Sequence, residues 1–372
     1  MKIAFFDVTN TGHHWFYNLN LILYTKEKYD VVYITKNITE DQLRILKENN
    51  IEIDLIKESN NYKFLPKLMK QLTTCKDYYF AKSVAKKKGV GIFVNLYFDQ
   101  YILPYYFDFK KIKTINILHW YPHNKLKIKF LSLLKKDNKH HFLVHTNETK
   151  KNLELINKEL NVTKLDYPIK EKISIKCNRN QMINALKLPI ELVDARTLLY
   201  FGGTRHDKGV DILIESLKFV NSNISLLIVG KEETFTRNFI QSKISELKVD
   251  VKVYMVLKYI PEGDVLKYFY IADAIVLPYR KYFNGESGIL TDAMQLGKPV
   301  VLPDIIHFPL IKEKYRNCEI FQAENPLKLA AAIDEVFLNL KEYSIKANKA
   351  SITFRRERNP KSFAENFINV LK

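Results

Sequence analysis

The sequence predicts an α/β protein made of two doubly wound domains, each with a parallel sheet. Short apolar runs alternate with segments of helical periodicity along both halves of the 372-residue chain. This alternation is typical of parallel sheets that are covered by helices on both faces. The length also exceeds what one ordinary core needs and fits two domains of roughly 150 to 200 residues each.

Eleven apolar runs are predicted strands. In the first half they are residues 2–8, 30–36, 51–57, 90–98, 113–120 and 140–147, and in the second half 197–203, 224–230, 251–257, 273–279 and 298–304. Between the halves, residues 165–195 lack a clean period and contain two prolines. We therefore expect a linker at 169–195.

Composition excludes several classes of protein. The three cysteines, Cys75, Cys177 and Cys318, are odd in number and far apart, which gives neither a disulfide framework nor a metal pattern. A reducing cytoplasm is therefore expected. No stretch approaches the ~18 apolar residues of a membrane span, so an integral membrane protein is not expected.

The net charge of +18 is concentrated in residues 61–150, which hold 18 lysines and 5 acidic residues. Within them, Leu126, Phe130, Leu133 and Leu134 form an apolar stripe along a lysine-rich segment. This pattern predicts either a basic amphipathic helix on an anionic membrane surface or a solvated lysine face. Nucleic acid is not an expected partner, because no nucleic-acid-binding motif accompanies the charge.

The stretch "YFGGTRHDKGVDILIESL", residues 200–217, reads as a strand, a tight glycine-containing loop and a helix. Arg205 and Lys208 stand between the glycines. Backbone N–H groups at such a loop, with two fixed cations beside them, suit a phosphate or diphosphate. This stretch therefore predicts an anion-binding loop.

A second glycine-containing cluster, residues 278–304, follows the predicted strand 273–279 and opens a helix at "SGILTDAMQLG". The backbone N–H groups predicted to receive a phosphate at this positive helix end are those of Ser287, Gly288, Ile289 and Leu290. Asp292, one to two turns further on, can hydrogen-bond a pair of ribose hydroxyls. An ordinary capped helix is the alternative interpretation.

"GGTRHDKGVDILIESL", "YIPEGDVLKYFYIADAIVLPYR" and "SGILTDAMQLGKPVV" occur in an order and spacing that resemble the donor-binding domain of family 4 glycosyltransferases. "TGHHWFYNL", "LHWYPHN" and "LVHTNETKKNLE" in the first half resemble the family more loosely. The resemblance implies the GT-B fold, in which two such domains face each other across a cleft. It predicts an acceptor-side domain at 1–168, to which a final helix at 359–372 returns, and a donor-binding domain at 196–358.

The resemblance assigns roles to residues of the predicted second domain. Arg205 and Lys208 would bind the donor diphosphate and stabilise the charge that grows on it as the sugar leaves. Gly203 is also an expected donor-binding residue, and Arg205 lies two positions beyond it, whereas the family's arginine more commonly stands at the position of Gly203. The nucleotide base would meet the backbone near Tyr259 and Ile260.

The family's Glu-x7-Glu motif is only partly present. Asp292 matches its second acid, which binds ribose. Asn284 stands at the first position, and Glu286 follows two residues later. The resemblance therefore implies either that Asn284 contacts the sugar through its amide or that Glu286 takes the role of the first acid.

In the predicted first domain, the resemblance places Gly12 in a loop that faces the donor phosphate and His119 near the transferred sugar. His14, in the same loop region as Gly12, is a further candidate. For both histidines a core or surface position with a satisfied hydrogen bond is the alternative. No Asp-x-Asp sequence stands where metal-dependent sugar transferases carry one, so no metal or other cofactor is expected.

The resemblance predicts a retaining glycosyltransferase that moves a hexose-type unit from a nucleotide diphosphate sugar to a glycan. The cysteines favour a cytoplasmic enzyme, and the basic first domain suggests that it is membrane-peripheral with an acceptor on a lipid carrier, in synthesis of a bacterial capsule, O-antigen or exopolysaccharide. One alternative is a non-catalytic partner subunit with the same fold, which Asn284 in place of an acid favours. Another is a nucleotide-sugar epimerase, which would use the same phosphate loop.

Overall fold

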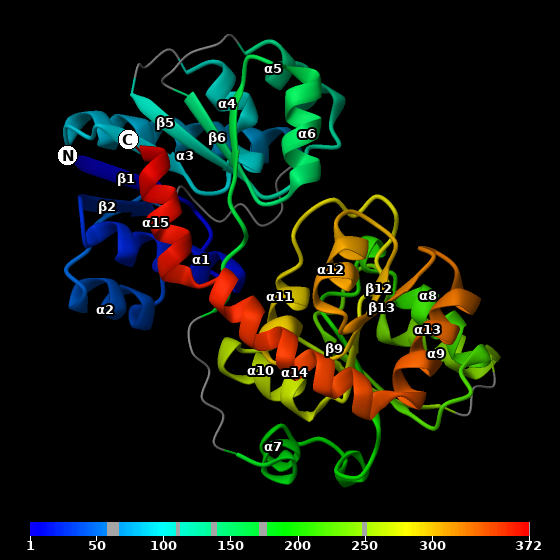
Figure 1. The fold of residues 1–372 in the computed structure, drawn as a ribbon. Helices are drawn as coiled ribbons and strands as arrows, with labels where there is room; N and C mark the ends of the chain where they lie inside the picture. Colours follow the sequence, from blue (N-terminus) through cyan, green and yellow to red (C-terminus); the bar gives the residue numbers. More distant parts are fainter. Residues whose placement is uncertain (58–66, 109–111, 135–139, 171–176, 248–250, 372) are drawn as a thin grey trace. The chain divides into compact units, whose positions relative to one another are not determined.

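The computed structural model describes residues 1–57, 67–108, 112–134, 140–170, 177–247 and 251–371 (Figure 1). The chain forms two compact units. Unit 1 comprises Met1–Lys170, Asn284–Glu286 and Arg358–Lys372, and unit 2 comprises Glu171–Phe283 and Ser287–Glu357. Of the predicted linker, residues 171–176 lie outside the described residues, and those from 177 onward belong to unit 2.

Unit 1 contains a parallel sheet of seven strands in the order β3-β2-β1-β4-β5-β6-β7. The strands are β1 (Lys2–Phe6), β2 (Asp30–Thr35), β3 (Glu52–Leu55), β4 (Ile92–Asn95), β5 (Lys113–Leu118), β6 (His140–Val144) and β7 (Asn161–Lys164). The helices are α1 (His13–Lys26), α2 (Glu40–Glu48), α3 (Lys67–Lys87), α4 (Ile102–Tyr106), α5 (Lys125–Ser132), α6 (Asn147–Ile156) and α15 (Pro360–Leu371).

Helices cover both faces of this sheet, because its central strands are apolar on both sides. Residues of α1, α2 and α15 pack on one face, and residues of α3, α4, α5 and α6 pack on the other. The final helix α15, red in Figure 1, lies beside the first helix α1, so the two ends of the chain share one core.

Unit 2 contains a parallel sheet of six strands in the order β10-β9-β8-β11-β12-β13. The strands are β8 (Thr197–Phe201), β9 (Ser225–Gly230), β10 (Lys252–Leu257), β11 (Ala274–Val276), β12 (Val300–Pro303) and β13 (Cys318–Phe321). The helices are α7 (Arg179–Ala185), α8 (Val210–Ser216), α9 (Arg237–Leu247), α10 (Glu262–Ile271), α11 (Gly288–Gln295), α12 (Phe308–Tyr315), α13 (Pro326–Leu338) and α14 (Leu340–Glu357).

The predicted fold class is confirmed, because each unit is a doubly wound parallel sheet. All eleven predicted strands are present, and the structure adds two that were not predicted, β7 and β13. Of the predicted basic region 61–150, residues 61–66, 109–111 and 135–139 lie outside the described residues. Within the part of the chain that is described, no helix has both the length and the apolar composition needed to cross a bilayer.

Candidate functional site

The predicted anion-binding loop joins β8 to α8 and contains a 3₁₀ turn at His206–Lys208. Gly209 ends this turn with a φ of +66°. A Cβ at this position would lie 2.0 Å from the carbonyl oxygen of Pro278. Only glycine therefore fits, since both the left-handed backbone and the close approach exclude a side chain.

Thr204 forms hydrogen bonds that connect the first part of the loop with residues 231–235, which follow β9. Its backbone N–H donates to the carbonyl oxygen of Lys231 at 3.0 Å, and its hydroxyl donates to that of Phe235 at 2.7 Å. The same hydroxyl accepts from the backbone N–H of Glu233 at 2.8 Å. These bonds give the loop a fixed path before it reaches the two predicted cations.

Arg205 is half-exposed and pairs with Asp207 inside the loop. Its Nε and a terminal nitrogen lie 2.9 and 2.7 Å from the two carboxylate oxygens of Asp207, a bidentate arrangement. The hydrogen bond with Asp207 raises the pKa of Arg205, so the guanidinium is charged throughout the physiological pH range.

Lys208 rests on aromatic rings. Its Nζ lies 3.8 Å from the centroid of Tyr279 and 4.3 Å from that of Phe283. Burial, followed by the neighbouring charge of Arg205, lowers the pKa of Lys208 to about 7. An anion bound beside this amine would favour its protonated form, because opposite charges stabilise each other where water is excluded.

Tyr279 links the two glycine-containing clusters within unit 2. The amine of Lys208 lies over its ring, and its hydroxyl lies 3.0 Å from Oγ of Ser287, at the start of α11. Ser287 Oγ in turn caps α11 by accepting from the backbone N–H of Leu290 at 3.2 Å. Of the four N–H groups predicted to bind phosphate, that of Leu290 is therefore already hydrogen-bonded.

The other predicted nucleotide contacts in unit 2 differ in exposure. Asp292, in α11, is 4% exposed and accepts a hydrogen bond from Gln295 at 3.0 Å. Tyr259 and Ile260 follow β10, where Tyr259 is exposed and Ile260 is buried. These ribose and base assignments stay predictions.

In unit 1, Gly12 precedes α1 with a φ of +58°. His14, in the first turn of α1, places its Nδ1 2.9 Å from a carboxylate oxygen of the buried Asp7. The imidazole also stacks on Tyr97, with ring centroids 3.5 Å apart. Asp7 and Tyr97 therefore fix the orientation of this ring.

His119 is buried at the end of β5 and stacks on Tyr97, with ring centroids 3.9 Å apart. Its Nε2 lies 3.0 Å from the carbonyl oxygen of Leu96, which can only accept. The ring hydrogen that makes this bond is therefore on Nε2. His14, Tyr97 and His119 together form an ordered group of rings in unit 1.

Residues 284–286 belong to unit 1. The amide nitrogen of Asn284 donates to the carbonyl oxygen of Tyr121 at 2.8 Å. Gly285 forms an isolated bridge with Trp120, and a Cβ at Gly285 would lie 2.6 Å from the Trp120 ring. The side chain of Glu286 is 7% exposed, with Oε1 3.8 Å from a guanidinium nitrogen of Arg358. Both candidates for the first acid of the motif thus make these contacts within unit 1.

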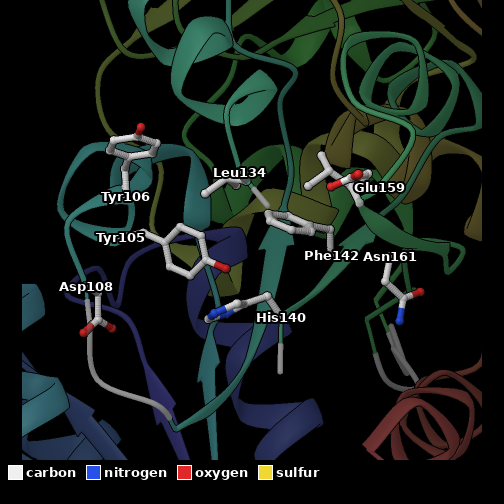
Figure 2. Close-up of a pocket in the computed structure, with 9 residues that line it drawn as sticks. Tyr105, Tyr106, Asp108, Leu134, His140, Phe142, Glu159 and Asn161 are labelled. Atoms are coloured by element: carbon white, nitrogen blue, oxygen red, sulfur yellow. The ribbon is translucent and has the colours of Figure 1, made fainter. Parts of the chain in front are cut away.

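A hollow of about 190 Å³ lies in unit 1, beside the first residues of β6 and β7 (Figure 2). Its lining residues are Tyr105, Tyr106, Asp108, Leu134, His140, Phe142, Glu159, Leu160 and Asn161. None is a predicted site residue. The carboxylate of Asp108 already pairs with the buried Lys82 at 3.0 Å, so this charge is compensated within the protein.

Over the described ranges, no three His, Cys, Asp or Glu side chains gather as a metal site would require. The structure thus groups Arg205, Lys208 and Ser287 in unit 2, and His14 with His119 in unit 1. Sequence reasoning missed Tyr279 and Asp7, which position members of these two groups. The only signal in the sequence was that the acid and the aromatic residue stand within the last two positions of predicted strands 2–8 and 273–279.

Residues 189–352 match the family model described as Glycosyl transferases group 1. A comparison with curated proteins gives no match. The matched segment covers most of unit 2 and includes the anion-binding loop and α11.

Solved structures resemble the whole chain in fold at low sequence identity. Sucrose-phosphate synthase from Thermosynechococcus elongatus has a TM-score of 0.77 at 13% identity, covering 100% of this chain and 98% of that chain. Anabaena HepE in complex with UDP and glucose has a TM-score of 0.76 at 14% identity, covering 100% of this chain and 99% of that chain. WaaG, a glycosyltransferase involved in lipopolysaccharide biosynthesis, has a TM-score of 0.71 at 12% identity, covering 100% and 99%.

Proposed function

We propose that the protein is a retaining, metal-independent family 4 glycosyltransferase that moves a hexose-type unit from a nucleotide diphosphate sugar to a glycan. The observation that carries this proposal is the cationic loop of unit 2, where Arg205 and Lys208 stand beside Tyr279 and the start of α11. The family match over residues 189–352 supports the same reaction class. HepE, which has the same fold, was solved with UDP and glucose.

In the proposed reaction, the bond between the anomeric carbon and the diphosphate oxygen breaks, and a bond from the acceptor hydroxyl oxygen forms on the same face. The leaving phosphate takes the acceptor's proton. Arg205 and Lys208 stabilise the negative charge that grows on the diphosphate, the kind of contribution for which losing one donor typically costs about 3 to 4 kcal/mol. Ser287, Gly288 and Ile289 would add backbone N–H groups, and Asp292 would hold the ribose.

The proposed roles of unit 1 concern the sugar and the acceptor. Gly12 and His14 would contact the donor, and His119 would lie near the transferred sugar. What supports these roles is that Asp7, Tyr97 and the Leu96 carbonyl hold the two imidazoles in fixed orientations. Asn284 or Glu286 would complete the sugar site.

We further propose an acceptor on a lipid carrier, in bacterial surface polysaccharide synthesis, and a cytoplasmic enzyme that associates with the membrane surface. Helix α5 and Leu133, which follows it, support this, because Leu126 and Leu133 are 55% and 52% exposed near the exposed Lys125 and Lys129. Such a surface suits an anionic bilayer. The other two residues of the predicted apolar stripe, Phe130 and Leu134, instead pack against the core of unit 1. Binding to anionic vesicles at low salt, weakened by Leu126→Ser, is the expected result; equal binding by both proteins would refute it.

A thermal-shift titration tests the central proposal. UDP, GDP, ADP, dTDP and CMP would be added in EDTA to the wild type and to Lys208→Ala. A ligand at about 100 times its Kd stabilises the native state by about 2.7 kcal/mol, which is a shift of several degrees. We expect one nucleoside diphosphate to give this shift in the wild type and not in the variant. No shift with any of them would overturn the proposal.

Turnover separates the proposed transferase from two alternatives. A non-catalytic partner subunit is favoured by one observation: the amide of Asn284, which stands in place of an acid, is bound to the Tyr121 carbonyl. Such a subunit would release no nucleotide. A nucleotide-sugar epimerase would convert the donor without an acceptor, whereas a transferase releases nucleotide slowly alone and quickly with acceptor.

A further inference from the structure

Arg280 lies directly against the anion-binding loop. It stands two residues after Pro278, whose carbonyl oxygen closely approaches Gly209. Three of its N–H groups donate to this loop or to the helix that follows it. The backbone N–H donates to the carbonyl oxygen of Asp207 at 3.0 Å. Nε donates to Nδ1 of His206 at 3.2 Å, and a terminal nitrogen donates to a carboxylate oxygen of Asp211 at 2.5 Å.

These three acceptors lie on both sides of Lys208 in the sequence. His206 and Asp207 precede it in the 3₁₀ turn, and Asp211 follows it in the first turn of α8. Arg280 therefore constrains the backbone before and after Lys208. Two residues close to Arg280 in the sequence also restrain the Lys208 side chain, because its amine lies over the rings of Tyr279 and Phe283.

The His206 ring has two polar contacts at one nitrogen. Nε of Arg280 can only donate, so Nδ1 of His206 accepts from it at 3.2 Å, and the hydroxyl of Tyr282 lies 2.8 Å from the same Nδ1. The ring is stacked against Phe235 and Tyr282, with centroids 6.0 and 6.2 Å away. Its position is therefore fixed by packing as well as by the hydrogen bond.

Charge and burial distinguish Arg280 from Lys208. The side chain of Arg280 is 11% exposed, and its charge is compensated by Asp211, 21% exposed. The amine of Lys208 instead lies against the aromatic rings of Tyr279 and Phe283. This arrangement suits a structural role for Arg280 and a ligand-binding role for Lys208.

We propose that Arg280 is a positioning residue, which holds the loop 205–211 in the conformation that presents Lys208 to the donor diphosphate. The identity of the ligand rests on the proposed function, but the ordering of the loop does not. Lysine is a poor substitute, because one ammonium group cannot reproduce the planar set of donors that reaches both His206 and Asp211.

Hydrogen exchange of the ligand-free protein tests the ordering directly. The backbone N–H of Lys208 donates to the Arg205 carbonyl at 3.0 Å, and that of Gly209 donates to the His206 carbonyl at 3.3 Å. We expect Arg280→Gln and Arg280→Lys to speed exchange of these two amides about tenfold or more, with β8 and β9 unchanged. Arg355→Gln, in α14, is the matched control and leaves the loop amides unchanged. Unchanged exchange in both Arg280 variants would overturn the proposal.

A double-mutant cycle on UDP affinity tests whether Arg280 acts through Lys208. We expect Arg280→Gln to weaken UDP binding about tenfold in the wild-type background and less than twofold when combined with Lys208→Ala. Equal losses in both backgrounds would show that Arg280 contacts the nucleotide independently, and would overturn the positioning role. If the wild type binds no nucleoside diphosphate, the proposed function fails, while the exchange result still decides the ordering of the loop.

Discussion

The amine of Lys208 lies 3.8 Å from the centroid of the Tyr279 ring, although the two residues are 71 positions apart in a glycine-poor sequence. Arg205 pairs with Asp207, and Arg280 pairs with Asp211, so carboxylates compensate both guanidinium charges. Lys208 rests on a ring face instead. We therefore expect a bound diphosphate to interact most favourably with this lysine. Without an anion, the surroundings of the amine disfavour its protonated form.

The first prediction concerns the pH dependence of nucleotide binding. Burial lowers the pKa of Lys208 to about 7, so the amine loses its proton as the pH rises above 7. Binding of a diphosphate favours the charged amine and must then be accompanied by proton uptake. UDP affinity is expected to fall by up to about tenfold per pH unit between pH 7 and 9, as measured by titration calorimetry.

Lys208→Arg provides the control, because a guanidinium stays charged over this whole range. Its affinity for UDP is expected to be nearly constant between pH 7 and 9. The second ionisation of a terminal phosphate, near pH 6, lies below the range and does not interfere. A wild-type profile as flat as that of the variant would contradict the prediction.

The second prediction separates the ring of Tyr279 from its hydroxyl. Tyr279→Phe keeps the face on which Lys208 rests but loses the hydrogen bond to Ser287, which typically contributes about 1 kcal/mol to stability. Tyr279→Leu loses the ring as well. We expect UDP affinity to change little in the first variant and to fall at least fivefold in the second, measured at pH 7. Equal affinities in the two variants would show that the ring face is unimportant.

Part of the candidate site was predictable because it depends on local sequence. Glycines at a strand end, two cations and a helix start are contiguous, so Arg205 and Lys208 could be identified together. Tyr279 and Arg280 could not, since their contacts with the loop depend on how β8 and β11 pair in the sheet. Long-range packing of this kind leaves no periodic signal.

The fold was predictable for the same kind of reason. Central strands are buried on both faces and appear as continuous apolar runs, which the eleven predictions used. The missed strands β7 and β13 are at sheet edges and have only four residues each. Asn161–Lys164 contains one apolar residue, Val162, so its sequence resembles a loop.

The third prediction concerns Gly209. Gly209→Ala would place a Cβ 2.0 Å from the Pro278 carbonyl oxygen and would also strain a φ of +66°. The loop must move, so we expect a loss of at least about 2 kcal/mol in stability together with weaker UDP binding. Gly263→Ala, in α10, is the matched control, because a Cβ there meets nothing within 4 Å. It is expected to stabilise the helix by about 0.5–1 kcal/mol, measured by urea denaturation.

If Gly209→Ala were as stable as the wild type, the left-handed turn and the contact with Pro278 would not describe the loop in solution. A variant that is destabilised yet binds UDP normally would instead show that the loop conformation is unnecessary for binding. Each outcome is read from one denaturation curve and one binding isotherm.

The fourth prediction concerns the stability of unit 1 in acid. His145 is buried, which lowers its pKa to about 4, and its Nε2 lies 3.2 Å from the Tyr17 hydroxyl. The unfolded chain has an ordinary histidine with a pKa near 6.5 and so binds more protons than the native state between about pH 6.5 and 4. Native stability must therefore fall as the pH drops through this window, by about 3 kcal/mol in total from this residue.

The His145→Gln variant lacks this titrating group, so comparing its stability with that of the wild type tests the contribution of His145. Both tryptophans, Trp15 and Trp120, belong to unit 1, so their fluorescence in urea reports on the unit that contains His145. We expect the variant to be less stable at pH 7, because a buried ring and its hydrogen bonds are lost, but to lose less further stability than the wild type between pH 7 and 5. The comparison cancels the other groups that titrate there, including Asp99, whose pKa burial raises to about 6 and whose effect has the opposite sign. Identical losses in the two proteins would mean that His145 is not held neutral by the fold.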